Sequence, residues 1–302
     1  MTAIDTALEA RLSRLPDRFL PRGYFYAAHF SLLIALVILL YEPRAIGGFF
    51  YHPRMLAVVH LVTLGWISSS ILGSLYLIGP MALRTPIRAG RLDRWAFASY
   101  LVGGSAMVSH FWIDAPIGMV FGAMMVTFAL VVVGGRFLGA VWHGPMRLEI
   151  KVFLSFPFAN ILGAAGLGIL IGLDKTIDLL PGTRLQYVFA HAHLAALGWA
   201  TMMVMAAGHR LLPMLLPSAL PQGRRVWSIA LCMEVGVLGL AGSLMGGSAW
   251  TGLFGGLCMV ALALFARNVI WMLRNPRPSP KNRRHPDLSV VQVFSAFACL
   301  AG

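Results

Sequence analysis

The chain has 302 residues, of which 58% are hydrophobic and only 12% are charged. This composition argues against a soluble enzyme, a disordered protein and a nucleic-acid-binding protein. The 24 Lys and Arg residues outnumber the 11 Asp and Glu residues, which gives a formal net charge of +13. The basic residues lie in short segments between apolar runs. Membrane topology therefore explains the charge, and we expect no nucleic-acid partner.

A helix that crosses a bilayer needs about 20 apolar residues, and eight stretches of the chain meet this length. They cover about 24–41, 55–80, 94–113, 115–142, 151–173, 186–217, 226–246 and 249–273. A ninth apolar stretch begins at about Leu288, and the sequence stops inside it. We therefore predict an all-α fold, a polytopic bundle of transmembrane helices with eight complete helices and the start of a ninth. The polar, amphipathic N-terminus lacks the pattern of a signal peptide, so we expect no cleaved leader.

The basic residues are divided unevenly between the two sides of the predicted membrane. Twenty lie on the side of the N-terminus, and the other side holds only four, Arg44, Arg54, Lys175 and Arg184. Because basic loops stay in the cytoplasm, we predict a bacterial-type inner (cytoplasmic) membrane protein with a cytoplasmic N-terminus. The side with four basic residues is called the outer side below.

The sequence contains an internal repeat. The segment His60–Leu83 aligns without gaps on the segment His193–Leu216, an offset of 133 residues, and the same offset relates the other helices of the two halves. The predicted domains are a cytoplasmic N-terminal segment 1–23, four-helix repeats 24–150 and 151–285, and the start of a third repeat 286–302. An even number of helices per repeat makes the halves parallel, so His60 and His193 should lie at the same depth.

Five histidines are expected in the outer half of the membrane, namely His52, His60, His110, His191 and His193. A histidine inside a bilayer is costly, which favours a functional role, although a hydrogen bond between helices is the alternative. His191 and His193 are two residues apart on one helix. Their side chains differ by about 200° in direction, so they should serve two different sites.

Two residue pairs follow the repeat-equivalent histidines at the same spacing. Gly65 and Gly198 lie five residues beyond His60 and His193, where the missing side chain would let a flat macrocycle approach the backbone. Trp66 and Trp199 come next and are expected to pack on the edge of that macrocycle. The alternative for this Leu-Gly-Trp motif is close packing of two helices through glycine.

The segment HAHLAALGW from His191 to Trp199 resembles the tenth helix of subunit I in the C-type branch of the haem-copper oxidases. The resemblance implies that His191 binds a high-spin haem and that His193 and His60 bind a low-spin haem. The segment HPRMLAVVH from His52 to His60 is loosely similar to a motif of the NnrS family, haem- and copper-containing membrane proteins of the nitric-oxide response. The chain departs from the oxidases in having no adjacent His-His pair.

The expected function is that of a haem-binding integral membrane protein in electron transfer or in O2 or NO chemistry or response. One or two b-type haems are expected, with a redox partner, and His110 or His52 would add copper if it is present. An enzyme of this kind would be an oxidoreductase of the haem-copper oxidase or nitric oxide reductase type. The alternatives are a proton or metal-ion transporter and a non-catalytic structural subunit of a respiratory complex.

Glu234 is the remaining candidate, because it lies about eight residues inside the seventh predicted helix from the cytoplasmic end. A carboxyl group at that depth is expected to be protonated or paired. Its functional interpretation is a proton relay to a redox centre. The structural alternative is a hydrogen-bonded glutamate that holds two helices together.

Overall fold

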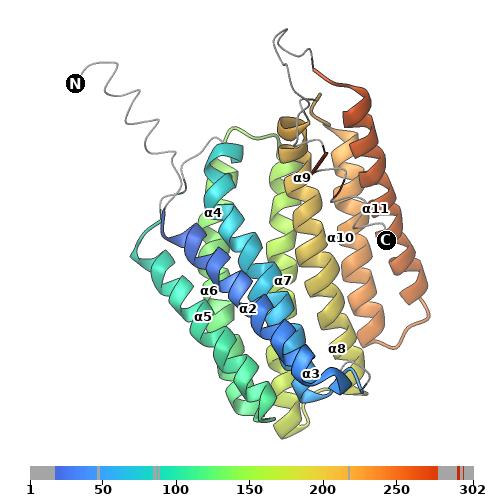
Figure 1. Cartoon of the computed structure of the whole chain (residues 1–302). Coiled ribbons are helices and arrows are strands. Elements are labelled where there is room, and N and C mark those ends of the chain that lie inside the picture. The colour runs from blue at the N-terminus through green and yellow to red at the C-terminus, as the bar shows by residue number, and fades with distance from the viewer. Residues whose placement is uncertain are drawn as a thin grey trace.

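The computed structural model describes residues 18–45, 48–83, 87, 89–216, 218–277, 291–292 and 295. The helices of this part stand side by side in one elongated bundle (Figure 1), which confirms the all-α fold. They are α2 Leu20–Tyr41, η1 Pro43–Ala45, α3 Pro53–His60, η2 Leu61–Ser68, α4 Ser69–Leu83, α5 Arg91–Trp112, α6 Pro116–His143, α7 Leu148–Ile177, α8 Arg184–His193, η3 Leu194–Thr201, α9 Met202–Leu215, α10 Arg224–Met245 and α11 Thr251–Arg274.

Two of the long helices are built from three consecutive pieces. α3, η2 and α4 form one continuous helix, and α8, η3 and α9 form another, because η2 and η3 are π-helical segments inside them. Counted in this way, seven helices of the described part of the chain are long and apolar enough to cross a membrane, and α5 is a further long helix with a charged first turn. This is the pattern of a multi-pass membrane protein. The predicted ninth helix lies almost wholly outside the described residues.

The element bounds follow the offset of 133 residues found in the sequence. α5 and α10 begin and end at equivalent positions, and so do the π-helical segments η2 and η3. The packing follows the same rule, since α2 lies on η2 and α4 while α7 lies on η3 and α9. The first helix of the second half begins at Leu148, three residues before the predicted boundary at 151. The domain boundaries themselves stay a prediction.

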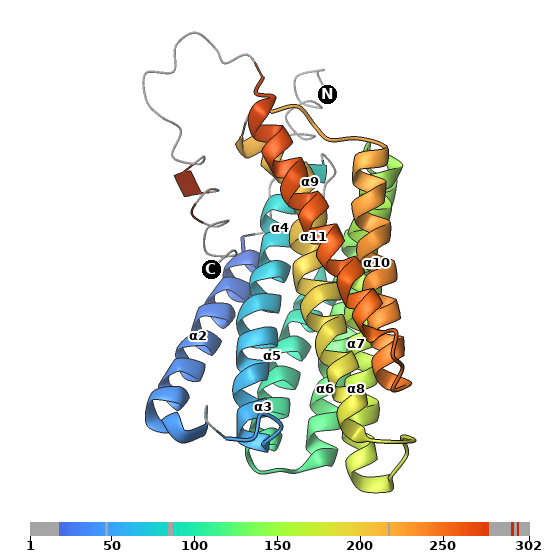
Figure 2. The same cartoon turned by 90° about the vertical axis from the view of Figure 1, so that its right-hand side faces the viewer.

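The two halves pack on each other mainly where α6 meets α7, and side-chain contacts also join the two three-piece helices. Figure 2 shows α2 beside α4 in the first half and α10 crossed by α11 in the second. α3 and α8 lie toward the same end of the bundle in both views. This end is the outer side, because it carries the α2–α3, α5–α6, α7–α8 and α10–α11 connections.

α5 and α6 cross at two glycines whose backbones touch. A Cβ atom on Gly103 would lie 2.6 Å from Cβ of Met125 and 2.7 Å from the carbonyl oxygen of Gly122. Gly236, at the equivalent position of α10, is similarly crowded by Cys258 of α11. Small residues at such crossings let two helices approach closely in a membrane.

Replacing Gly103 by alanine should therefore separate α5 from α6. We expect Gly103→Ala to lower the free energy of unfolding by about 1–3 kcal/mol, the usual cost of overpacking. Gly104→Ala is the matched control, because a Cβ atom there meets nothing within 4 Å. Thermal unfolding in mild detergent measures both variants. Equal melting temperatures for the two would contradict this account of the crossing.

Candidate functional site

His60 and His191 lie together at the outer side of the interface between the two halves. Their ring centroids are 6.3 Å apart, and the ring planes differ by 30°. Phe111 of α5 stacks on His60 with a centroid distance of 4.6 Å. We call His60 and His191 the histidine pair. α3 and α8 thus supply the two rings of the pair, and α5 supplies the phenyl ring that stacks on His60.

Backbone carbonyl groups fix the orientation of both rings. Nδ1 of His60 is 2.7 Å from the carbonyl oxygen of Leu56 on the same helix. Nδ1 of His191 is 2.8 Å from the carbonyl oxygen of Ala164 on α7. A carbonyl oxygen only accepts hydrogen bonds, so each Nδ1 carries the hydrogen and each neutral ring keeps a lone pair on Nε2. A histidine whose Nδ1 donates in this way is oriented for a metal at Nε2.

His193 and His110 also hydrogen-bond through Nδ1, each to the carbonyl oxygen four residues earlier on its own helix. Nδ1 of His193 bonds to the carbonyl oxygen of Phe189 at 2.7 Å, and Nδ1 of His110 bonds to that of Ala106 at 2.6 Å. Within the described part of the chain, His193 makes no ring contact with either member of the histidine pair. The reason is the rotation of about 200° between neighbours two apart on a helix.

His52 has the opposite proton arrangement. It caps the N-terminus of α3, where its Nδ1 accepts a hydrogen bond of 3.3 Å from the backbone N–H of Arg54. The hydrogen of the neutral ring must therefore lie on Nε2. In this tautomer the Nε2–H group donates a hydrogen bond and offers no lone pair to a metal, and the copper at His52 stays a prediction.

The π-helical segments begin directly after His60 and His193. In such a segment an N–H group bonds to the carbonyl five residues earlier, as Ser69 does to Leu64 and Met202 does to Leu197. Side chains from neighbouring helices bond to carbonyls of both segments. The hydroxyl of Tyr100 on α5 donates to the carbonyl of Leu64 at 2.8 Å. Segments of this kind occur frequently at functional sites.

A hydrogen bond joins the two π-helical segments. Nε1 of Trp199 donates to Oγ of Ser68 at 3.0 Å, and the Trp199 side chain is only 1% exposed and lies edge-on to Phe158. Trp66, the repeat-equivalent residue, is 37% exposed. Trp199 thus lies at the interface between the halves, and its indole N–H is already hydrogen-bonded to Ser68.

Side chains of neighbouring helices fill the space beside Gly65 and Gly198. A Cβ atom on Gly65 would lie 2.5 Å from Cβ of Ser31 on α2, and one on Gly198 would lie 2.7 Å from Cβ of Asn160 on α7. These contacts favour the packing interpretation of the Leu-Gly-Trp motif over an approach of a macrocycle to these two glycines.

Glu234 on α10 is half-buried and hydrogen-bonded to α7. Its Oε2 accepts a bond of 2.8 Å from Nδ2 of Asn160, and the same Nδ2 lies 3.3 Å from the carbonyl oxygen of Gly198 in η3. Asn160 is 1% exposed, and its Oδ1 has no hydrogen-bond partner among the described residues. A polar chain therefore runs from Glu234 through Asn160 to the π-helical segment that follows His193.

Sequence reasoning missed Asn160, Tyr100 and Phe111. The available signal was the polar group of Asn160 inside the apolar run of α7, since buried polar groups in a membrane need partners. Nothing in the sequence pattern distinguishes Tyr100 or Phe111 from other aromatic residues of the spans.

No group of three or more His, Cys, Asp or Glu side chains that could hold a metal ion was found within the described ranges. A haem iron needs one or two imidazole ligands, and the histidine pair offers two imidazoles with a free Nε2 lone pair. No family model, curated protein or solved structure matches the chain.

The Trp199–Ser68 bond can be tested by substitution. Trp199→Phe and Ser68→Ala should each destabilise the protein, and a double-mutant cycle should give a coupling of about 0.5–1.5 kcal/mol. Trp66→Phe is the matched control, because Trp66 is partly exposed at the equivalent position. Thermal unfolding in detergent is the measurement. Additive effects of the two substitutions would show that the bond does not hold the halves together.

Proposed function

We propose that this chain binds a b-type haem in the outer half of the membrane and acts in electron transfer or in O2 or NO chemistry or response. The observation that supports this most is the histidine pair, in which both Nδ1 atoms donate to carbonyl oxygens and both Nε2 atoms keep a lone pair. The resemblance of the His191–Trp199 segment to the C-type oxidases supports the same proposal. A bound haem supplies one-electron redox chemistry.

The residues around the pair would orient and shield these ligands. The carbonyls of Leu56 and Ala164 hold the two rings and raise the basicity of their Nε2 atoms. Phe111 covers one ring of the pair and limits the access of water to it. The ring of His191 also lies against Gly168, where a Cβ atom would come within 3.0 Å of its Cε1.

Two different pairs of histidines would be able to hold the haem. Nearness favours His60 together with His191. The resemblance to the oxidases favours His60 together with His193, with His191 on a second haem. Both pairs include His60. They differ in whether removal of His191 would abolish the low-spin haem spectrum.

Visible spectra of the purified protein test the proposal. We expect a Soret band that shifts on reduction by dithionite, and we expect His60→Ala to remove the low-spin component. His143→Ala is the control, because its Nδ1 makes the same bond, to Gly139, at the other end of the bundle. If His191→Ala also removes the low-spin component while His193→Ala spares it, the near pair is correct, and the reverse result favours the oxidase-like pair. The absence of any Soret band after haem-replete expression would overturn the proposal.

Glu234 would carry protons that accompany reduction of the site. Its bond to Asn160 connects it to η3, and a carboxyl group at this depth can exchange a proton where an amide cannot. We expect Glu234→Gln to leave haem content and folding unchanged while proton uptake on reduction falls severalfold. An unaltered proton uptake would assign Glu234 a purely structural role.

We also propose that the basic end of the bundle faces the cytoplasm of a cell with a bacterial-type inner membrane, as the distribution of Lys and Arg indicates. A proton transporter is the second candidate, and the Glu234–Asn160 bond between two membrane helices favours it. Haem-free protein that moves protons into liposomes, and loses this activity in Glu234→Gln, would establish that candidate.

A further inference from the structure

The hydrogen bond that joins the two halves has an unused counterpart on the same chain. In the interface, Nε1 of Trp199 in the second half donates to Oγ of Ser68 in the first half at 3.0 Å. The offset of 133 residues relates Trp199 to Trp66 and Ser68 to Thr201. We call the side of a half that carries Ser68 or Thr201 its hydroxyl face, and the side that carries Trp66 or Trp199 its indole face. The chain thus has one more face of each kind than its own interface uses.

The hydroxyl of Thr201 is oriented like that of Ser68. Oγ of Ser68 donates to the carbonyl oxygen of Thr63 at 2.8 Å, and Oγ1 of Thr201 donates to that of Ala196, the equivalent residue, at 2.9 Å. A hydroxyl that donates one hydrogen bond can still accept another, as Ser68 does from the indole of the second half. Thr201 is partly exposed, and no side chain of the described residues donates to its oxygen.

Trp66 presents an indole N–H without a partner near the middle of the membrane. Its side chain is 37% exposed, against 1% for Trp199, and no hydrogen bond within the described ranges uses its Nε1. Trp66 lies about 20 Å along the helix from Pro53, inside a 30-residue span. Lipid tails accept no hydrogen bond, and water is absent at this depth. The N–H of Trp66 therefore needs an acceptor from protein.

The hydroxyl face of the second half is exposed along α11 as well. Leu253 and Ile270 are 60% and 48% exposed, whereas their equivalents on α6, Val120 and Phe137, are buried where α6 packs on α7. Arg267 stands between them where α6 has a glycine. It lies in the last turns of α11, so its long side chain can reach the cytoplasmic surface.

The two unused faces also differ from the used ones toward the cytoplasmic end. There, Nε of Arg210 donates to the carbonyl oxygen of Ala82 across the interface at 2.8 Å. The equivalent residues are Leu77 on the indole face of the first half and Leu215 on the hydroxyl face of the second half. Both leucines are exposed, so at this depth the unused faces offer an apolar pair in place of a polar one.

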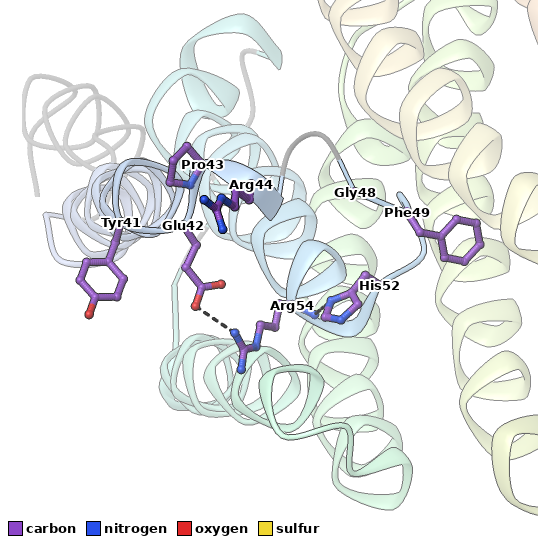
Figure 3. A pocket seen from close by; sticks show the side chains of 8 residues that line it. All are labelled: Tyr41, Glu42, Pro43, Arg44, Gly48, Phe49, His52 and Arg54. Carbon is purple, nitrogen blue, oxygen red and sulfur yellow. Dashed lines mark hydrogen bonds and ion pairs between the residues drawn. The ribbon is translucent and has the colours of Figure 1, made fainter.

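A small ligand does not account for the exposure of these faces. The pocket of about 540 Å³ opens at the outer side, where Figure 3 shows the ion pair of Glu42 and Arg54 among its lining residues. Neither Trp66 nor Thr201 lines this pocket. Their faces are open to the membrane, so the partner that covers them has to lie in the membrane as well.

We propose that a second copy of this chain binds to these faces, with Nε1 of Trp66 in one copy donating to Oγ1 of Thr201 in the other. A second copy carries both counterparts of the contact that joins the halves, and it has the same orientation in the membrane. A twofold axis normal to the membrane gives two such contacts, one from each copy. The contact is independent of the haem proposal, since neither residue belongs to the histidine pair.

Association of the full chain in liposomes tests this proposal. Two pools of the protein carry donor and acceptor dyes on terminal tags, and energy transfer is followed against the protein-to-lipid ratio. We expect a dimer, and we expect Thr201→Val to weaken it by about three- to tenfold, as for the loss of a neutral hydrogen bond. Thr127→Val is the matched control, because Thr127 is also partly exposed and bonded to its own helix, on α6. Equal weakening in both variants would overturn the proposal, and so would energy transfer no greater than that of randomly mixed monomers.

Photo-cross-linking identifies the faces directly. The photoreactive residue p-benzoylphenylalanine replaces Trp66 in one copy, which is reconstituted with a wild-type copy labelled with heavy isotopes. We expect irradiation to join position 66 to the labelled peptide that contains Thr201. The same probe at Leu238, which is 52% exposed on α10, is the matched control and should not reach that peptide. Cross-links from position 66 that reach only its own chain, or another face of the labelled copy, would overturn the proposal.

Discussion

The interface between the two three-piece helices sets the relative position of His60 and His191. It is made at three depths, by His60 with His191, by Ser68 with Trp199, and by the carbonyl of Ala82 with Arg210. In a bilayer the lipid tails are as apolar as the side chains, so apolar burial gives two helices little reason to associate. The side-chain contacts between the two helices therefore set their rotation and height.

The π-helical segments make this interface depend on the helices around it. They disturb the regular ladder of backbone hydrogen bonds, and an unsatisfied carbonyl is costly where water is absent. Tyr100 on α5 bonds to a carbonyl of η2, and Asn160 on α7 bonds to a carbonyl of η3. A shift of α5 or α7 would therefore change the segment that directly follows His60 or His193.

The sequence predicted the spans, their order and the repeat, because hydropathy over about 20 residues records the thickness of the membrane. It did not predict which histidines meet. The repeat makes His193 the equivalent of His60, yet His60 meets His191. Ser68 likewise meets Trp199, two residues before its own equivalent at Thr201. The position of a residue in the repeat fixes its depth in the membrane. The residue that it contacts in the other half depends on how the two halves are rotated against each other. Side-chain packing decides that rotation.

The halves share their frame but differ in the polar groups that reach the π-helical segments. In the first half the group is the hydroxyl of Tyr100, which is a weak acid. In the second half it is the amide of Asn160, which is bonded to the carboxyl of Glu234. The position equivalent to Glu234 in the first half is Leu101. Among the described residues, only the second half joins a carboxyl side chain to its π-helical segment, and this difference supports the proposed proton role of Glu234.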